Sequence, residues 1–363
     1  MRRILPYIIL AIISIFSTLI IWKAVGMEKI YKNFDGPLYV VPAKTLYSFD
    51  EIKKLKIEQG IQPNYFAAHL PSYPLLIRLV SQIGLIENLK YLKAMILVNV
   101  IFTVFLVWFF YFLLKKFKIT KKPFFLSIVF LFLPRFLVIR SVGAPESIFI
   151  FFILLSLYFF EKERYWLAGL FGGLAVATKT PGILLFGGYC LVFIERLLKE
   201  KKINWQWLGV LLIPLGLLTV FGFYYLKTGD FLAYFHSGDN IHLVYPFAVF
   251  NFTKTWVGTA WLEEIIFYYF LYGLTVYSLK NSKLRSFFYF SLLFFIAIIF
   301  VEHRDISRYS LPLWPMALIS FEKFFTSRKF LTIFFILLTG IFFYAINFAS
   351  ANLMPISDWK AFL

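Results

Sequence analysis

The feature of this chain that most constrains its fold is a series of apolar runs along almost its whole length. Seven runs are long enough to cross a bilayer as a helix, which takes about 20 residues, and four are shorter or interrupted. The long runs begin near Ile4, Ala94, Phe124, Trp207, Val257, Ser286 and Phe330, and the short ones cover 147–160, 165–178, 183–194 and 309–321. Short or broken spans are tolerated where they line a cavity. We therefore expect an all-α polytopic membrane protein with about 11 transmembrane helices in a single domain over residues 1–363.

Composition agrees with this class and argues against others. The chain is 61% hydrophobic, above the roughly half that is usual for soluble domains. The net charge of +18 could indicate nucleic-acid binding, but the Lys and Arg residues cluster between apolar runs, as short cytoplasmic loops require. The single cysteine, Cys190, lies inside an apolar run, which excludes an intramolecular disulfide and argues against a zinc site.

The placement of charge predicts how the helices are oriented. Five short basic connections are expected in the cytoplasm, at 115–122, 161–164, 195–202, 280–285 and 322–329. The opposite side then holds two long extracytoplasmic loops, 23–93 and 226–257, and three short ones, 140–146, 179–182 and 302–308. The N-terminus is cytoplasmic in this arrangement, and the run from Ile4 is a first transmembrane helix rather than a cleavable signal. Amphipathic patterns over 49–57 and 74–86 predict short interfacial helices in the first loop.

An acidic residue, Asp35, stands just past the first apolar run and is followed by Gly36 and Pro37. A carboxylate at a membrane boundary is a candidate general base, or a group that orients an acceptor hydroxyl. Gly36 would let the backbone approach a ligand closely. An Asp-Gly-Pro turn at a helix exit explains the same residues without any function, and the residues alone leave the two readings equal.

Several cations on the same predicted side could bind a phosphate. Arg78 could pair with one and His69 could donate to one, whereas snorkelling and a hydrogen bond within the loop explain them equally well. Lys179 lies in a turn between two short apolar runs and could contact a lipid phosphate. Glu146 opens an apolar helix after Pro145, where it would favour the helix dipole.

The segment 302–309 is the densest charged cluster on that side, with Glu302, His303, Arg304, Asp305, Arg308 and Tyr309. Arg304 and Arg308, with His303 and Tyr309 beside them, suit a phosphate headgroup. The alternative is a loop that neutralises itself, with its two acids paired to its two arginines. We favour the phosphate interpretation because the cluster falls on the same side as Asp35.

A metal site has weaker support. His236, Asp239 and His242 have a ligand-like spacing, but no fourth ligand is evident in the sequence. No cofactor is identified, and a divalent cation stays open.

Five segments, in order along most of the chain, resemble those of a known superfamily. Asn-Phe-Asp-Gly at 33–36 is similar to a Trp-Asp-Gly first-loop motif, with Phe for Trp, and the Pro-punctuated segment 67–76 is similar to a Phe-Pro-x-x-Pro-Leu segment. Ala-Pro-Glu-Ser at 144–147, the stretch 166–182 with Lys179 in place of an Arg, and Arg308-Tyr309 before a Pro-containing helix match later segments. The chain resembles the GT-C superfamily of polytopic glycosyltransferases, and within it the branch of the GPI mannosyltransferase with the Trp-Asp-Gly motif and its prokaryotic relatives.

This resemblance implies a GT-C-like fold and an inverting transfer of sugar on the extracytoplasmic face, with Asp35 as the catalytic carboxylate. The donor would be a polyprenyl-phosphate sugar, with mannose or a similar hexose, and the acceptor a hydroxyl of a lipid, glycan or protein. The phosphate of the donor would be bound by Arg304, Arg308, Lys179 and Arg78. Supporting residues would be Gly36, His69, Glu146, His303 and Tyr309. No nucleic acid takes part.

A flippase or transporter of lipid-linked glycans is the alternative, because broken helices and membrane-buried cations are common there as well. Transporters often consist of two related halves, and the sequence contains no such repeat. A third reading is a scaffold without catalytic activity in a glycan-assembly complex.

Overall fold

The computed structural model describes residues 4–57, 61–83, 90–238, 243–260 and 262–363. Throughout these ranges the regular structure is helical, and β pairing is limited to two isolated bridges, Asn33 with Leu353 and Leu243 with Val301. The predicted all-α fold class is therefore confirmed.

The helices follow the apolar runs closely. The first part of the chain contains α1 (Leu5–Val25), α2 (Met27–Tyr31), α3 (Gly36–Thr45), α4 (Phe49–Lys54), α5 (Ser72–Gln82) and α6 (Tyr91–Lys116). The middle contains α7 (Pro123–Leu131), α8 (Pro134–Arg140), α9 (Glu146–Glu161), α10 (Tyr165–Thr178), α11 (Leu184–Glu200), α12 (Leu212–Thr228) and α13 (Ala233–His236). The last part contains α14 (Glu263–Leu279), α15 (Arg285–Ile299), α16 (Ile306–Tyr309), α17 (Trp314–Ser320), α18 (Glu322–Phe325) and α19 (Arg328–Ala351).

The protein is an integral membrane protein, but the expected count of about 11 crossings is not confirmed. Among the described residues, five helical stretches are long and apolar enough to cross a bilayer: Leu5–Val25, Tyr91–Lys116, Thr180–Glu200, Trp205–Thr228 and Arg328–Ala351. A sixth is reached if α7 and α8, bent by 72° at a two-residue break before Pro134, form one span. The other runs are helical but shorter, because hydropathy reports apolar character and not whether a segment reaches both membrane surfaces.

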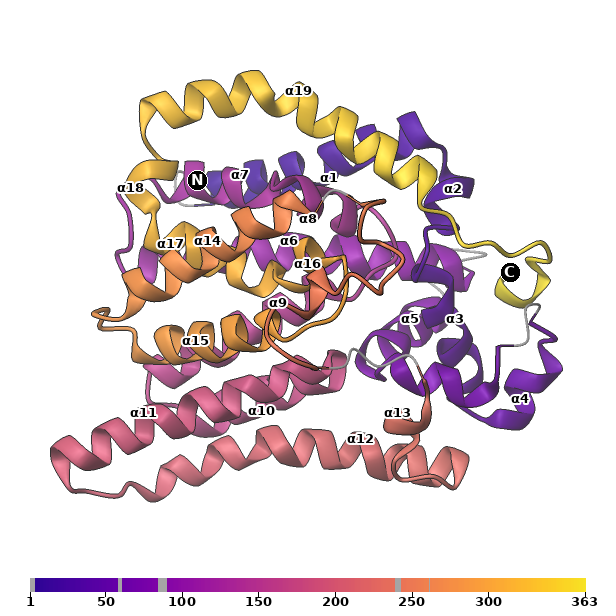
Figure 1. Cartoon of the computed structure of the whole chain (residues 1–363), viewed down its shortest axis with the longest axis horizontal. Coiled ribbons are helices and arrows are strands. Elements are labelled where there is room, and N and C mark those ends of the chain that lie inside the picture. The colour runs from indigo at the N-terminus through magenta and orange to yellow at the C-terminus, as the bar shows by residue number, and fades with distance from the viewer. Residues whose placement is uncertain (1–3, 58–60, 84–89, 239–242, 261) are drawn as a thin grey trace.

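The long first loop is mostly helical. The helices expected within 49–57 and 74–86 are present as α4 and α5. A third helix, α3, is not predicted from the sequence, where Asp35-Gly36-Pro37 is considered as a site or as a turn and not as a helix start. Pro37 instead lies in the first helical turn of α3, where its missing N–H costs nothing. The helices α3, α4 and α5 gather at one end of the bundle, close to α13 and to the C-terminus (Figure 1).

The turn between α8 and α9 is fixed by two side chains from other helices. Trp22 Nε1 donates to the Ser141 carbonyl at 2.7 Å, and Asn99 Nδ2 donates to the carbonyls of Ile139 and Val142 at 2.9 and 2.5 Å. Both pairings satisfy carbonyls at the end of α8 that have no helical partner. The position of this turn matters because it leads directly into Glu146.

Glycines bring α3 against the same turn. A Cβ on Gly36 would lie 3.1 Å from the carbonyl oxygen of Gly143, a tight contact that would push the two backbones slightly apart. This close approach is to another part of the chain, and the expected approach of Gly36 to a ligand stays a prediction. The contact with Gly143 places Asp35 next to the segment that carries Glu146.

Candidate functional site

Four charged side chains from four distant segments meet in one cluster. The Arg308 guanidinium donates through Nη1 to Asp35 Oδ2 and through Nε to Glu146 Oε1, the latter at 2.7 Å. Lys179 Nζ donates to the same Glu146 oxygen at 2.8 Å. We call Asp35, Glu146, Lys179 and Arg308 the charged centre.

Local structure presents each of the four at the end of a helix. Asp35 is the N-cap of α3, but its carboxylate makes no capping bond because it turns to Arg308. Glu146 is the first residue of α9, Lys179 is the C-cap of α10, and Arg308 lies in the short helix α16. Helix ends bring together side chains that lie far apart in the chain.

Burial differs sharply within the charged centre. The Glu146 side chain is 2% exposed and that of Arg308 12%, whereas that of Asp35 is 30% exposed. Two acids and two bases cancel in formal charge, which lowers the cost of burying them. Asp35 is therefore the most exposed member of the charged centre, and its Oδ1 has no hydrogen bond within the described part of the chain.

The neighbours of Asp35 keep it ionised. Burial alone would raise the pKa of Asp35, but the adjacent Arg308 guanidinium outweighs it and holds that pKa below its usual value. Burial would lower the pKa of Arg308, and the carboxylates of Glu146, Asp35 and Asp305 raise it well above its usual value. Both groups are thus charged at neutral pH.

His69 lies beside the charged centre as a neutral imidazole. Two hydroxyls hold its loop, with Tyr47 Oη donating to the His69 carbonyl and Tyr224 Oη to the Ala67 carbonyl at 2.9 Å. Its ring packs edge-on against Tyr39, with centroids 4.7 Å apart. Burial lowers the pKa of His69 to about 4, with partial opposition from Asp35. A neutral His69 contributes no positive charge toward a phosphate.

His303 and Tyr309 pack against each other with ring centroids 5.1 Å apart, and Lys179 Nζ lies 5.7 Å from the centre of the Tyr309 ring. His303 Nδ1 accepts the Asp305 backbone N–H at 3.0 Å. Burial lowers the pKa of His303, and the nearby Arg304 lowers it further. These two aromatic side chains line the charged centre on the α16 side.

The segment 302–309 does not neutralise itself. Glu302 accepts from Lys254 Nζ at 2.7 Å, and Asp305 accepts from Arg135 of α8. Arg308 is bonded to the charged centre, and Arg304 is exposed and has no ion-pair partner within the described ranges. Each acid of this segment is paired with a base from another part of the chain.

Arg78 lies apart from the charged centre. Its Nη1 donates to the carbonyls of Ala43 and Lys44 at 3.0 and 2.9 Å, at the C-terminal end of α3. These contacts cap a helix, so the structure does not bring Arg78 together with the other three cations predicted to bind phosphate.

Arg135 is a further charged residue that was not among the predicted site residues. It is 4% exposed, pairs with Asp305, and has its guanidinium carbon 4.1 Å from the centre of the Phe348 ring of α19. The sequence does contain a signal for it, since a cation at membrane depth requires an anion or water nearby.

The candidate metal ligands do not form a site in the described ranges. His236 Nδ1 lies 2.7 Å from Asp230 Oδ2, while Asp239 and His242 lie outside the described residues. No group of three or more His, Cys, Asp or Glu side chains that could hold a metal ion occurs in the part of the chain that the structure describes.

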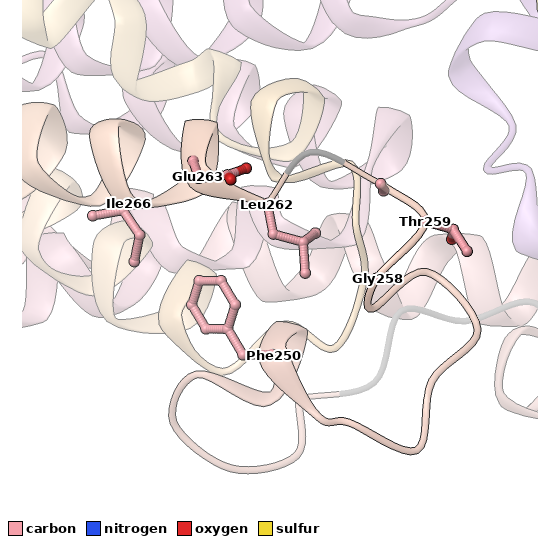
Figure 2. A pocket seen from close by; sticks show the side chains of 7 residues that line it. Phe250, Gly258, Thr259, Leu262, Glu263 and Ile266 are labelled. Carbon is pink, nitrogen blue, oxygen red and sulfur yellow. The ribbon is translucent and has the colours of Figure 1, made fainter.

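An open pocket lies at the N-terminal end of α14, a helix that packs against α16 (Figure 2). It is lined by Phe250, Gly258, Thr259, Ala260, Leu262, Glu263 and Ile266. The charged side chain in this lining is the acid Glu263. Because a carboxylate repels a phosphate, the pocket is a poor site for the donor phosphate.

Comparison with known proteins supports the fold. No protein-family model matches the chain, and no curated protein matches it in sequence. Among solved structures, the chain is similar to the crystal structure of the oligosaccharyltransferase of Archaeoglobus fulgidus, tethered by a disulfide to an acceptor peptide with the NVT sequon. The TM-score is 0.55 with 14% identity, over 98% of this chain and 56% of that one. The chain thus spans little more than half of that protein and has a GT-C-like membrane fold.

Proposed function

We propose that this protein is a membrane glycosyltransferase that moves a sugar from a polyprenyl-phosphate-linked donor to an acceptor hydroxyl, with inversion at the anomeric carbon. The sugar is mannose or a similar hexose, and transfer takes place on the extracytoplasmic face. The observation that carries this proposal is an ionised, partly exposed Asp35 beside Arg308, within a GT-C-like fold. The GPI mannosyltransferase branch stays a prediction from its sequence motifs.

In the proposed reaction, the acceptor oxygen attacks the anomeric carbon and the bond from that carbon to the phosphate oxygen breaks. The acceptor proton passes to Asp35, and the lipid phosphate leaves with the bonding electrons. Asp35 can accept this proton because Oδ2 is bonded to Arg308 while Oδ1 has no partner among the described residues. Glu146 shares Arg308, which limits how strongly the guanidinium withdraws charge from Asp35.

The four cations predicted to bind the donor phosphate are not equally available. Lys179 is bonded to Glu146, and Arg308 has only Nη2 without a bond among the described residues. Arg304 is exposed and two residues beyond Glu302, which is paired elsewhere. We therefore assign the main stabilisation of the leaving phosphate to Arg304, with Arg308 Nη2 in support.

The alternative, a flippase or transporter, would require the substrate site to become accessible from each side of the membrane in turn. Against it, the charged centre is closed by hydrogen bonds between α3, α9, α10 and α16, all at helix ends. A binding site near the midplane between repeats would be expected in a transporter.

The test uses the purified protein in lipid, with polyprenyl-phosphate mannose and related hexose donors. Release of lipid phosphate that depends on an acceptor and is lost in Asp35→Asn supports the proposal. Movement of the donor across vesicles without release would instead support the flippase. The same assay with and without a chelator determines whether a divalent cation takes part.

A further inference from the structure

The C-terminal segment 352–363 runs alongside the turn that carries Asp35. The Phe34 N–H donates to the Asn352 carbonyl at 3.0 Å, and the Met354 N–H donates to the Lys32 carbonyl at 2.8 Å. These two bonds flank the isolated bridge between Asn33 and Leu353. Both neighbours of Asn33 are thus tied to the C-terminal segment, which we call the strap.

The strap continues to the other end of α3. Lys44 Nζ, in the last turn of α3, donates to the carbonyls of Ala361 and Leu363 at 2.9 and 2.6 Å. Phe362 is fully buried. Since the strap is bonded before the first residue of α3 and again at its last turn, it can fix the position of that helix along its own axis.

The helix that leads into the strap, α19, is linked to α16 through Arg135 of α8. The ring of Phe348 in α19 packs on Arg135, and Arg135 pairs with Asp305, the residue that begins α16. Arg308 lies one turn further along. In Figure 1, α19 runs along the upper edge of the bundle and leads into the strap, beside the end where α3 lies.

The turn itself has little to hold it. The helix before it, α2, has five residues, and Asp35 makes no side-chain cap on α3. Within the turn, the Gly36 N–H donates to the Asn33 carbonyl at 3.0 Å. Besides the strap, its contacts with distant parts of the chain include the approach of Gly36 to Gly143 and the ion pair from Asp35 to Arg308. An unsupported turn would let the carboxylate drift, and a shift of about 1 Å at a reacting group can cost roughly 10²-fold in rate.

We propose that the strap is a positioning element of the active site, which holds Asp35 in register with Arg308 and Glu146 and so sets the rate of transfer rather than the binding of the donor. This inference rests on the proposed function for its kinetic part. Its structural part, that the strap holds the turn, is independent of any activity.

Two variants of the full chain test it in lipid nanodiscs. Met354→Pro removes the N–H that bonds the Lys32 carbonyl, and Met354→Leu is its matched control. Lys44→Met removes the second attachment and keeps the apolar stem, with Lys93→Met, an exposed lysine of α6, as control. Lys44→Met also serves if Met354→Pro does not fold.

We expect kcat to fall about tenfold to a hundredfold in Met354→Pro and less in Lys44→Met, with the donor KM unchanged within about twofold. The acid limb of the kcat profile should move to higher pH, because Asp35 faces Arg308, His69 and Glu146 and loses most of its stabilisation when Arg308 is no longer aligned. The controls should behave as wild type. Unchanged kcat and pH profile in both variants overturn the proposal, as does a rise in donor KM with kcat intact.

Hydrogen–deuterium exchange over residues 27–45 tests the role of the strap without depending on whether the protein transfers a sugar. Faster exchange in both variants, and not in the controls, shows that the strap holds the turn. Unchanged exchange overturns the strap even if the enzyme is active. Absence of transfer by the wild-type protein overturns the proposed function, and the exchange measurement still decides the strap.

Discussion

Arg140 and Arg308 are both largely buried, and their surroundings differ in chemistry. Arg140 is fully buried and donates to the carbonyls of Leu131 and Ser14, both at 3.1 Å, and to the hydroxyls of Ser17 and Thr18, both at 2.8 Å. All four acceptors are neutral. Arg308 instead donates to the two carboxylates of Asp35 and Glu146.

The difference shows what each arginine can do. The Arg140 contacts tie α1 to the broken helix of α7 and α8, and none of the acceptors can gain or lose a proton near neutral pH. The Arg308 contacts join groups that can titrate, and one of them, Asp35, is 30% exposed. Buried neutral oxygens around a cation favour a structural role, whereas shared carboxylates favour a site of proton transfer.

The sharpest test of this comparison is Asp35→Asn, which keeps the size of the side chain and removes the proton acceptor. We expect transfer to fall by about 10²- to 10⁴-fold, the usual contribution of a general base. The matched change beside Arg140 is Ser17→Ala, which should leave transfer unchanged. An Asp35→Asn variant with normal turnover in the lipid-phosphate release assay would remove Asp35 from the mechanism.

Removing each arginine should separate the two regions by stability. Arg308→Met leaves two carboxylates near one lysine and should cost about 3–5 kcal/mol, as for other buried pairs broken on one side. Arg140→Met leaves only neutral acceptors, at a cost of about 1–3 kcal/mol. Unfolding of both variants in the same detergent gives the comparison. A larger loss for Arg140→Met would reverse our assignment of the two regions.

The two regions should also differ in their response to acid. His69 takes up a proton near pH 6.5 in the unfolded chain but only near pH 4 in the fold, so the stability that it contributes above pH 6.5 is lost as the pH falls between these values. Below pH 4 the free energy of unfolding has lost about 3 kcal/mol, because the pKa of His69 is 6.5 in the unfolded chain and about 4 in the fold.

Unfolding midpoints measured at pH 7.5, 5.5 and 4.5 test this. His69→Gln should flatten the dependence, and Arg140→Met should leave its slope unchanged because the acceptors around Arg140 do not titrate in this range. An equal slope in wild type and His69→Gln would show that the fold does not lower the pKa of His69.

The smallest effect concerns cations outside both regions. Arg304→Gln should lower kcat/KM for the donor about tenfold, the equivalent of one charge-assisted hydrogen bond to the leaving phosphate. Arg78→Gln should leave the donor KM unchanged and lower stability by about 1 kcal/mol, because Arg78 caps α3. Steady-state kinetics with a fixed acceptor measure both variants. If Arg78→Gln raises the donor KM and Arg304→Gln has no effect, the donor phosphate is bound by Arg78 in the first loop and not by Arg304.

The sequence by itself identifies the class of protein and most of its long apolar helices. Apolar side chains partition into lipid wherever they occur in the chain, so hydropathy along the sequence is sufficient to predict an all-α membrane fold. Asp35, Glu146, Lys179 and Arg308 are also recognisable one by one, because a charged residue beside an apolar run needs an explanation. The sequence missed α3, although Pro37 in its first turn was a usable signal.

Only the tertiary structure decides which charges meet. Asp305 and Arg308 are three residues apart, yet one pairs with Arg135 of α8 and the other with Asp35 and Glu146. The residues Asp35 and Arg308 are separated by 273 positions. Ion pairing depends on distance in space and on burial, neither of which is a property of local sequence. For the same physical reason, only the fold distinguishes Arg78, which caps a helix, from Arg308, and only the fold places the strap beside Asp35.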